Sequence, residues 1–175
     1  MIPVSPDSSA NLPQSPAVPE SERPSGGAVS VGIVLVSHSQ ALAEAALDLA
    51  RRLIVAVDVP VELAAGLAAG GLGTDPGAVV EAVERLAERC EGVLVLADLG
   101  SGIMSAEMAL EMLDPALAER TRLSAAPFVE GLLGAYGAAG IGKDLQAVAA
   151  EADGAAEAKR SQVAAFCRAS DALRC

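Results

Sequence analysis

The sequence predicts an α/β fold, a doubly wound and mainly parallel sheet with helices on both of its faces. Short, continuous runs of apolar, mostly β-branched residues alternate with longer segments of helical periodicity, and this alternation is repeated four times. A continuous apolar run indicates a strand that is buried on both faces, as in a parallel sheet. Hydrophobic residues make up 52% of the chain, which has one Tyr, two Phe and no Trp. The hydrophobic residues are mainly Ala, Val and Leu. Such small side chains favour helices packed closely on a sheet.

Four strands are expected from the apolar runs. Each run is short and is bounded by polar or glycine-rich segments. The stretch after the second run holds several glycines and predicts a turn. The strands are expected at residues 31–36, 61–65, 93–97 and 122–125.

Five helices are expected between and after these strands. The first shows leucine and alanine at helical spacing. The second has Thr74 or Asp75 as its N-cap, followed by a proline in the first turn, and Pro127 opens the fourth. The fifth is expected to fray beyond Lys159. The helices are expected at residues 41–54, 75–90, 100–113, 127–139 and 143–167.

The composition divides the chain into three parts. Residues 1–28 are rich in Pro, Ser, Asn and Gly and are expected to form a disordered leader. Residues 29–160 are expected to form one domain with a sizeable core. Residues 161–175 are expected to be a frayed or disordered tail.

Charge and cysteine usage exclude several classes of protein. The formal net charge is -11, so nucleic acid and anionic membrane surfaces are not expected partners, whereas a basic patch on another protein is. The three cysteines, Cys90, Cys167 and Cys175, have no C-x-x-C spacing, which argues against a zinc site. Cys90 is interpreted as a small buried residue at a helix end. No stretch has the length of a membrane span or the pattern of a signal peptide, so a cytoplasmic protein is expected.

The only histidine stands where a buried strand is expected to end. His38 directly follows the first apolar run, and Asp98 directly follows the third. In a doubly wound sheet, functional groups gather beyond the carboxyl ends of the strands, so the two side chains are expected at the same edge. Asp98 could then orient one ring nitrogen and leave the other as a nucleophile, although a general base is also possible. Taken alone, Asp98 could equally be a plain helix N-cap.

The residues around this pair are suited to phosphate. Gly100, Ser101 and Gly102 begin a helix, whose unpaired N–H groups favour an anion, and Ser39 adds a further hydroxyl. These loops contain no Lys or Arg, and no P-loop or G-x-G-x-x-G pattern follows the first strand. We therefore expect a transient phosphoryl group and no bound cofactor.

Three further groups of residues have simpler interpretations. The methionines at positions 104, 108 and 112 recur every four residues and are interpreted as core or as a dimer face. Glu107 and Glu111 are interpreted as a solvated helix face. Glu130 is interpreted as a first-turn charge that complements a helix end.

Several motifs between Val29 and Lys159 resemble one known family. The chain is similar to the phosphocarrier subunits (the DhaM family) of phosphoenolpyruvate-dependent dihydroxyacetone kinase, whose domain belongs to the mannose-type IIA group of the bacterial phosphotransferase system. The motifs agree in order and spacing. They are Leu-Val-Ser-His38-Ser, Ala-Ala-Gly66, Gly-Thr-Asp75, Leu-Ala-Asp98-Leu-Gly-Ser101, Ser-Ala-Glu107 and Ala-Pro-Phe-Val-Glu-Gly131.

The resemblance implies a fold, a function and partners. It implies the mannose-type IIA fold and a histidine, matching His38, that the phosphocarrier HPr phosphorylates. The phosphoryl group would then pass to ADP on the nucleotide-binding subunit of dihydroxyacetone kinase. It also implies a homodimer, and Asp98 matches the acidic partner of the histidine.

Three alternatives remain at this stage. A mannose-type IIA domain that serves sugar transport would use the same chemistry with a different acceptor. A regulatory module would alter its binding to another protein when phosphorylated. A flavodoxin-like cofactor binder is disfavoured because few aromatic residues are present to hold a flavin.

Overall fold

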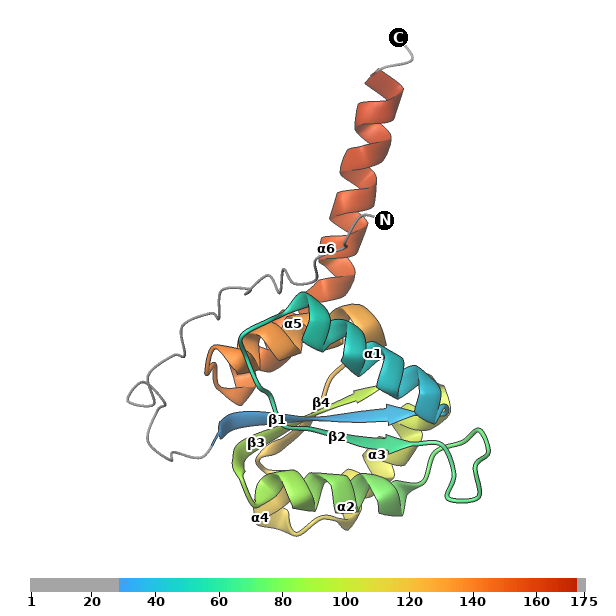
Figure 1. The fold of residues 1–175 in the computed structure, drawn as a ribbon, viewed down its shortest axis with the longest axis vertical. Helices are drawn as coiled ribbons and strands as arrows, with labels where there is room; N and C mark the ends of the chain where they lie inside the picture. The colour runs from blue at the N-terminus through green and yellow to red at the C-terminus, as the bar shows by residue number, and fades with distance from the viewer. Residues whose placement is uncertain (1–28, 173–175) are drawn as a thin grey trace, which may run out of the picture.

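The computed structural model describes residues 29–172, and the expected leader, residues 1–28, lies outside the described residues together with Cys175. Four parallel strands form one sheet in the order β2-β1-β3-β4, which confirms the predicted α/β class. Helices cover both faces of this sheet, as Figure 1 shows. The strands are β1 (Val29–Ser37), β2 (Val61–Ala65), β3 (Cys90–Ala97) and β4 (Thr121–Leu123).

The helices divide into two layers. Helices α1, α5 and α6 lie on one face of the sheet, and α2, α3 and the short α4 lie on the other (Figure 1). The long α6 projects beyond the rest of the molecule. The helices are α1 (Gln40–Leu53), α2 (Pro76–Ala87), α3 (Gly100–Met112), α4 (Pro115–Ala118), α5 (Phe128–Gly140) and α6 (Leu145–Ala172).

The continuous apolar runs are explained by this double layer. In β1, Ile33 and Leu35 pack under α1 and α5, whereas Val34 and Val36 pack against α2 and α3. All four side chains are fully buried. Burial of each such side chain contributes about 1.5–3 kcal/mol to folding, so the central strands form a stable platform whose ends can carry polar groups.

The structure corrects the predicted boundary at Cys90. Helix α2 ends at Ala87, and Cys90 is a buried first residue of β3 rather than the end of a helix. The guanidinium of Arg120 donates hydrogen bonds to the carbonyl oxygens of Ala87 and Cys90. It therefore satisfies carbonyl groups at the end of the helix and the start of the strand, a distant contact that local sequence does not reveal.

The other helix boundaries differ less from the predicted ones. Asp75 is the N-cap of α2, which decides between the two predicted capping residues. The sequence analysis did not predict α4, and α6 continues to Ala172, beyond the expected fraying point at Lys159. Cys167 is an exposed, free thiol on this last part of α6. Within residues 29–172, no helix has both the length and the apolar character required to cross a bilayer.

The three methionines of α3 are not core residues. Met104, Met108 and Met112 are 62%, 53% and 61% exposed, because the buried side of the helix is formed by Gly102, Ser105, Ala106 and Ala109. The core interpretation was therefore wrong. Glu107 and Glu111 are exposed, as predicted, and Glu130 lies in the first turn of α5.

Candidate functional site

The site lies where β1 and β3 end, at the carboxyl edge of the sheet. The register pairs Val36 with Ala97, and the Asp98 N–H donates to the carbonyl oxygen of Val36. The residues that follow each strand, His38 and Asp98, therefore lie side by side. Their expected meeting at one edge of the sheet is confirmed, and it follows from two adjacent strands of a parallel sheet ending together.

The Asp98 carboxylate accepts hydrogen bonds at both oxygens. Its Oδ1 accepts from the Leu99 N–H at 2.7 Å and lies 2.9 Å from the Nδ1 atom of His38. Its Oδ2 accepts from the His38 backbone N–H at 2.9 Å and from the Ser37 hydroxyl at 2.9 Å. The carboxylate is thus held in one orientation by three neighbours besides the imidazole.

The charged form of Asp98 is favoured in this setting. Burial raises the pKa of the carboxyl, but the hydrogen bonds from the His38 backbone, the His38 ring, Ser37 and Leu99 together outweigh it and lower the pKa below its ordinary value. An ionised carboxylate only accepts hydrogen bonds, so it selects the tautomer or cation in which the Nδ1 of His38 carries a proton.

The other ring nitrogen of His38 faces the start of α3. Its Nε2 lies 2.5 Å from the Ser101 hydroxyl, and the side chain is 24% exposed, compared with 6% for Asp98. With Nδ1 protonated, neutral imidazole accepts at Nε2, and the Ser101 hydroxyl donates. The site therefore presents a partly exposed nitrogen lone pair, held from behind by a buried carboxylate.

Helix α3 begins without a side-chain cap among the described residues. Its N-cap residue is Leu99, which makes no capping hydrogen bond, and Asp98 accepts from Leu99 N–H instead of capping the first turn. The simple N-cap interpretation of Asp98 was therefore wrong. The uncapped first turn leaves N–H groups and the positive end of the helix directed toward an incoming anion.

Gly100 and Gly102, the two glycines predicted to bind phosphate, have different surroundings. A Cβ atom at Gly102 would lie 3.0 Å from Asp98 Oδ1 and 3.8 Å from the Cε1 atom of His38, so a side chain here would press on the His–Asp pair. Gly100 is exposed, and a Cβ atom there would meet no atom within 4 Å. A side chain at 102 would therefore crowd the Asp98 carboxylate, where α3 approaches the pair.

Ser39 directly follows His38 and lies at the start of α1. Its hydroxyl oxygen accepts a hydrogen bond from the Leu42 N–H at 3.3 Å, which makes Ser39 the N-cap of α1. Its predicted role in phosphate binding remains a prediction, as do those of Gly100, Ser101 and Gly102.

The sequence analysis assigned no site role to three hydroxyl residues near the pair, which are Ser37, Thr74 and Ser105. Ser37 is fully buried and bonded to Asp98, and Thr74 lies 2.8 Å, hydroxyl to hydroxyl, from Ser105 of α3. The Gly73 N–H also donates to the His38 carbonyl oxygen at 2.9 Å. The loop after β2 is thereby tied both to the end of β1 and to α3. A serine that ends an apolar run was the available signal for Ser37, whereas the contact of Thr74 depends on tertiary packing.

A hollow of about 650 Å³ adjoins the site but does not enclose the imidazole. It is lined by Ser39, Gln40, Asp75 and much of the loop 66–72, and His38 and Ser101 are not among its lining residues. Within residues 29–172, no three His, Cys, Asp or Glu side chains gather as a metal site requires. The arrangement is that of an accessible nucleophile at a rim.

Comparison with known proteins identifies the family. The model of the EIIA-man family, described as the PTS system fructose IIA component, matches residues 32–149. The chain belongs to the EIIA-man family. The match includes most of β1, all of the other three strands and both loops that carry His38 and Asp98.

Several curated relatives of this EIIA-man domain are named as phosphoryl donor subunits. The chain is 44% identical over 135 residues to the "PEP-dependent dihydroxyacetone kinase, phosphoryl donor subunit DhaM" of Klebsiella michiganensis, and 43% identical to that of Escherichia coli K12. These alignments cover 76% of the chain but 28% of each relative. A Listeria innocua protein, "PEP-dependent dihydroxyacetone kinase 2, phosphoryl donor subunit DhaM", is 37% identical over 101 residues, which cover 58% of the chain and 79% of that relative.

A solved structure agrees with the fold of this EIIA-man domain. The crystal structure of protein EF1359, of unknown function, superposes with a TM-score of 0.65 and 30% sequence identity. The superposition covers 71% of this chain and 93% of that one.

Proposed function

We propose that this EIIA-man domain is a phosphohistidine carrier that serves a dihydroxyacetone kinase. His38 would accept a phosphoryl group from phosphorylated HPr and pass it to ADP held by the nucleotide-binding subunit of the kinase. The observation that carries the proposal is the imidazole itself, with Nδ1 bonded to a buried carboxylate and Nε2 partly exposed beside a helix N-terminus. The names of the curated relatives support the same role.

In the first step, the Nε2 lone pair of His38 attacks the phosphorus of the phosphohistidine on HPr. A new N–P bond forms at Nε2 while the N–P bond of the donor breaks, and the electron pair returns to the donor imidazole. The ring of His38 gains positive charge, which the ionised Asp98 stabilises through Nδ1–H. The phosphoryl oxygens would meet the uncapped N–H groups of α3 and the hydroxyl of Ser101.

In the second step, a β-phosphate oxygen of ADP attacks the phosphorus on His38. The N–P bond breaks, its electron pair returns to Nε2, and ATP and the original His38–Asp98 pair result. Because the relay uses one nitrogen in both directions, the site must stabilise the phosphoryl group only moderately. Neutral donors, without a Lys or Arg in the loops that carry His38 and Asp98, suit that requirement.

The proposal extends to assembly and location. A homodimer is implied by the resemblance to the phosphocarrier family, and a cytoplasmic location is part of the same proposal. The phosphoryl donor HPr and the kinase subunit would be the successive partners of the domain.

The direct test is phosphoryl transfer from phosphoenolpyruvate through enzyme I and HPr to the purified protein. We expect one labelled phosphohistidine in the wild type and none in His38→Ala, because the chain contains no other histidine. A chase with the ADP-loaded kinase subunit should remove the label and produce ATP. Equal labelling of the wild type and His38→Ala would contradict the proposal.

A second candidate is the IIA component of a sugar phosphotransferase system, and the description of the matching family model favours it. The site chemistry would be the same, but the acceptor would be a IIB protein. Discharge of the label by a IIB protein, with none by the kinase subunit, would select this function. Discharge by neither acceptor would instead favour a regulatory module.

A further inference from the structure

Ser101 contacts the same nitrogen of His38 that the phosphoryl relay uses. Its hydroxyl oxygen lies 2.5 Å from Nε2, and the Nδ1 atom of the ring lies 2.9 Å from Oδ1 of Asp98. Because the ionised carboxylate keeps a proton on Nδ1, the neutral ring only accepts at Nε2, and the Ser101 hydroxyl is the donor. Carboxylate, imidazole and hydroxyl are therefore connected in the order that activates a serine as a nucleophile.

Ser101 also occupies a turn between a strand and a helix. It is exposed and lies in the first turn of α3, directly beyond the end of β3. The first hydrogen bond of the helix runs from the Ile103 N–H to the Leu99 carbonyl oxygen at 3.0 Å. The N–H groups of Ser101 and Gly102 come before it and have no carbonyl partner within the helix. Such N–H groups beside a nucleophile can stabilise the oxyanion that forms when a hydroxyl adds to a carbonyl group.

The loop after β2 fixes the position of this turn. The Thr74 hydroxyl lies 3.5 Å from the carbonyl oxygen of Ser101 and 2.8 Å from the Ser105 hydroxyl, further along α3. The Asp98 carboxylate is fixed as well, because it accepts from the backbone N–H of His38. The three reactive side chains are thus held in place before any substrate binds, as catalysis by positioning requires.

The hollow beside the site offers space for a small substrate. Its volume is about 650 Å³, and its lining includes Ser39, the residue after His38, and Asp75, which directly follows the loop that contacts α3. The hollow therefore adjoins both the strand end that carries the imidazole and the loop that holds the serine turn. Leu67 and Leu72 also line it, and such apolar side chains suit a short acyl chain.

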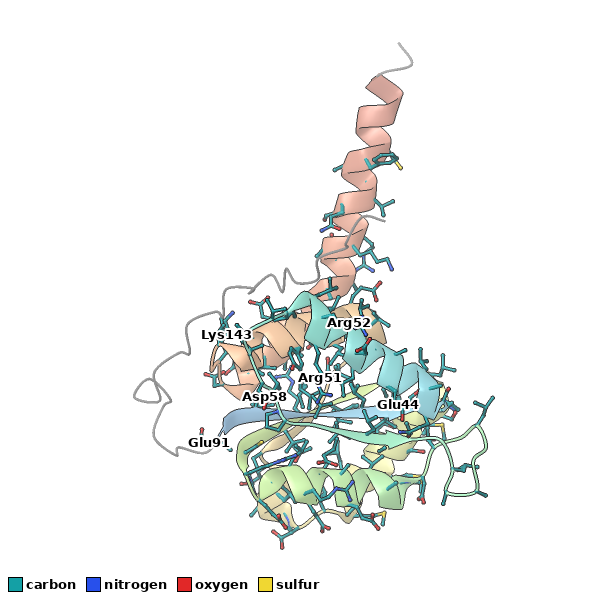
Figure 2. The ribbon with its side chains drawn as sticks, viewed as in Figure 1. Glu44, Arg51, Arg52, Asp58, Glu91 and Lys143 are labelled. Atoms are coloured by element: carbon teal, nitrogen blue, oxygen red, sulfur yellow. The ribbon has the colours of Figure 1, made fainter. Side chains whose placement is uncertain are left out.

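The charges of the site segments favour a neutral substrate. No Lys or Arg occurs in residues 24–50, 53–84 or 90–119, the segments that include the loops after the first three strands. Figure 2 shows Glu44 on the half of α1 nearer to the carboxyl ends of the strands, whereas Lys143 lies toward the opposite end of the molecule. An anionic ester would meet no cation from these segments, so a neutral acyl ester is the class of substrate that fits.

We propose that Ser101, His38 and Asp98 form a catalytic triad that hydrolyses small, neutral acyl esters. The Ser101 oxygen attacks the acyl carbon while its proton moves to Nε2 of His38, and the N–H groups of the first turn of α3 meet the oxyanion. Collapse of this intermediate breaks the bond to the alcohol, which takes the proton from Nε2 as it leaves. Water then attacks the acyl carbon, its proton passes through Nε2 to the Ser101 oxygen, and the carboxylic acid is released. Asp98 stabilises the imidazolium that forms in each half of the reaction.

This hydrolysis goes beyond the proposed phosphoryl transfer and does not depend on it. The two uses of Nε2 exclude one another, because a phosphorylated Nε2 has no lone pair to accept the serine proton. The test therefore uses the unphosphorylated protein without HPr or the kinase subunit, and its failure would leave the proposed function intact.

The first measurement is hydrolysis of 4-nitrophenyl acetate by the purified protein. In Ser101→Ala and in His38→Ala we expect kcat/KM to fall by about a hundredfold or more, because the nucleophile or its general base is lost. The matched control is Ser161→Ala, which removes another exposed hydroxyl, one that bonds to Glu157 on α6. Its rate should stay within about twofold of the wild type.

A second measurement is needed because an imidazole is itself able to attack an activated ester. The wild type is treated with an alkyl fluorophosphonate, and the modified residue is located by mass spectrometry. We expect the Ser101 oxygen to displace fluoride, which gives one phosphonyl adduct on Ser101 that His38→Ala does not form. An unchanged hydrolysis rate in Ser101→Ala, or an equal loss in Ser161→Ala, would overturn the proposal. Absence of an adduct on Ser101 of the wild type would also overturn it, whatever the stability of the variants.

Discussion

Two strand ends of this molecule are built in the same way, yet only one presents a reactive group. At the end of β1, Asp98 accepts from the hydroxyl of the buried Ser37 and from the next backbone N–H. Beyond the end of β4, Asp153 of α6 accepts from the hydroxyl of the buried Ser124 at 2.5 Å and from the Ala125 N–H at 3.1 Å. In both places a carboxylate holds the chain as it leaves a strand.

The two carboxylates differ in their remaining partner. Asp98 holds an imidazole whose second nitrogen is partly exposed at a helix N-terminus, whereas Asp153 lies 3.7 Å from the guanidinium of Arg122. A guanidinium keeps its protons and offers no lone pair, so the Asp153 arrangement can only support structure. An Asp–Ser unit can thus serve a purely structural role, and we propose that it becomes functional where it orients a group able to attack.

The largest difference between the two carboxylates is expected in the rate of phosphoryl transfer. In Asp98→Asn, the amide cannot stabilise the charge that develops on the ring of His38, so transfer from HPr should slow by about a hundredfold or more. Asp153→Asn should leave transfer within about twofold of the wild type while lowering thermal stability. The measurements are rapid-quench labelling and calorimetry of both variants.

Comparable transfer rates in Asp98→Asn and Asp153→Asn would show that Asp98 is only a backbone support. A large loss of transfer in Asp153→Asn would show that the two strand ends are coupled in function.

The serines of the two sites should also differ, because loss of one should affect transfer and loss of the other should affect stability. Ser101→Ala removes the hydroxyl that meets Nε2 and should slow transfer about tenfold, with little change in stability. Ser124→Ala leaves a carboxylate and a backbone N–H without one partner and should cost about 1 kcal/mol of stability, with normal transfer. Denaturant unfolding and labelling of both variants check this, and the reverse assignment would contradict it.

A smaller effect on transfer is expected from Thr74. Thr74→Val removes the hydroxyl that bonds to Ser105 and should allow the first turn of α3 to shift, so that transfer slows by about threefold. Thr74→Ser keeps the hydroxyl and should restore the rate. A valine variant with wild-type transfer would limit Thr74 to packing.

The smallest effect is on the pH dependence of stability. Because the pKa of Asp98 is lowered in the folded state, the unfolded chain binds more protons as the pH falls below about 4. The stabilisation by Asp98 is therefore present above the unfolded pKa and is lost as the pH falls through the folded pKa. The difference in unfolding free energy between the wild type and Asp98→Asn should be greatest at neutral pH and shrink in acid. A difference that grows in acid would contradict the lowered pKa.

The fold and the central pair could be predicted because their signals are local. The apolar runs identify parallel strands, and parallel topology brings the ends of β1 and β3 together, so His38 and Asp98 follow from position alone. Ser101 and Gly102 were found in the same way, as the start of a helix after a strand.

The remaining features depend on contacts that the local pattern does not encode. Arg120 meets carbonyl groups thirty residues earlier, at the point where the boundary of β3 was misplaced. Thr74 was one of two candidate caps for α2, whereas in the structure its hydroxyl contacts α3. The exposure of the methionines depends on which side of α3 faces the sheet, and a helix with small residues on its buried side gives a weak periodic signal.

The most direct test of the account is to identify which nitrogen of His38 carries the phosphoryl group. Phosphorylated protein labelled with ¹⁵N-histidine should show phosphorus coupling to Nε2, with Nδ1 protonated and hydrogen-bonded to Asp98. This result would confirm that the carboxylate orients the ring so that Nε2 is the acceptor. Coupling to Nδ1, or a phosphoryl group on any residue other than His38, would contradict the account.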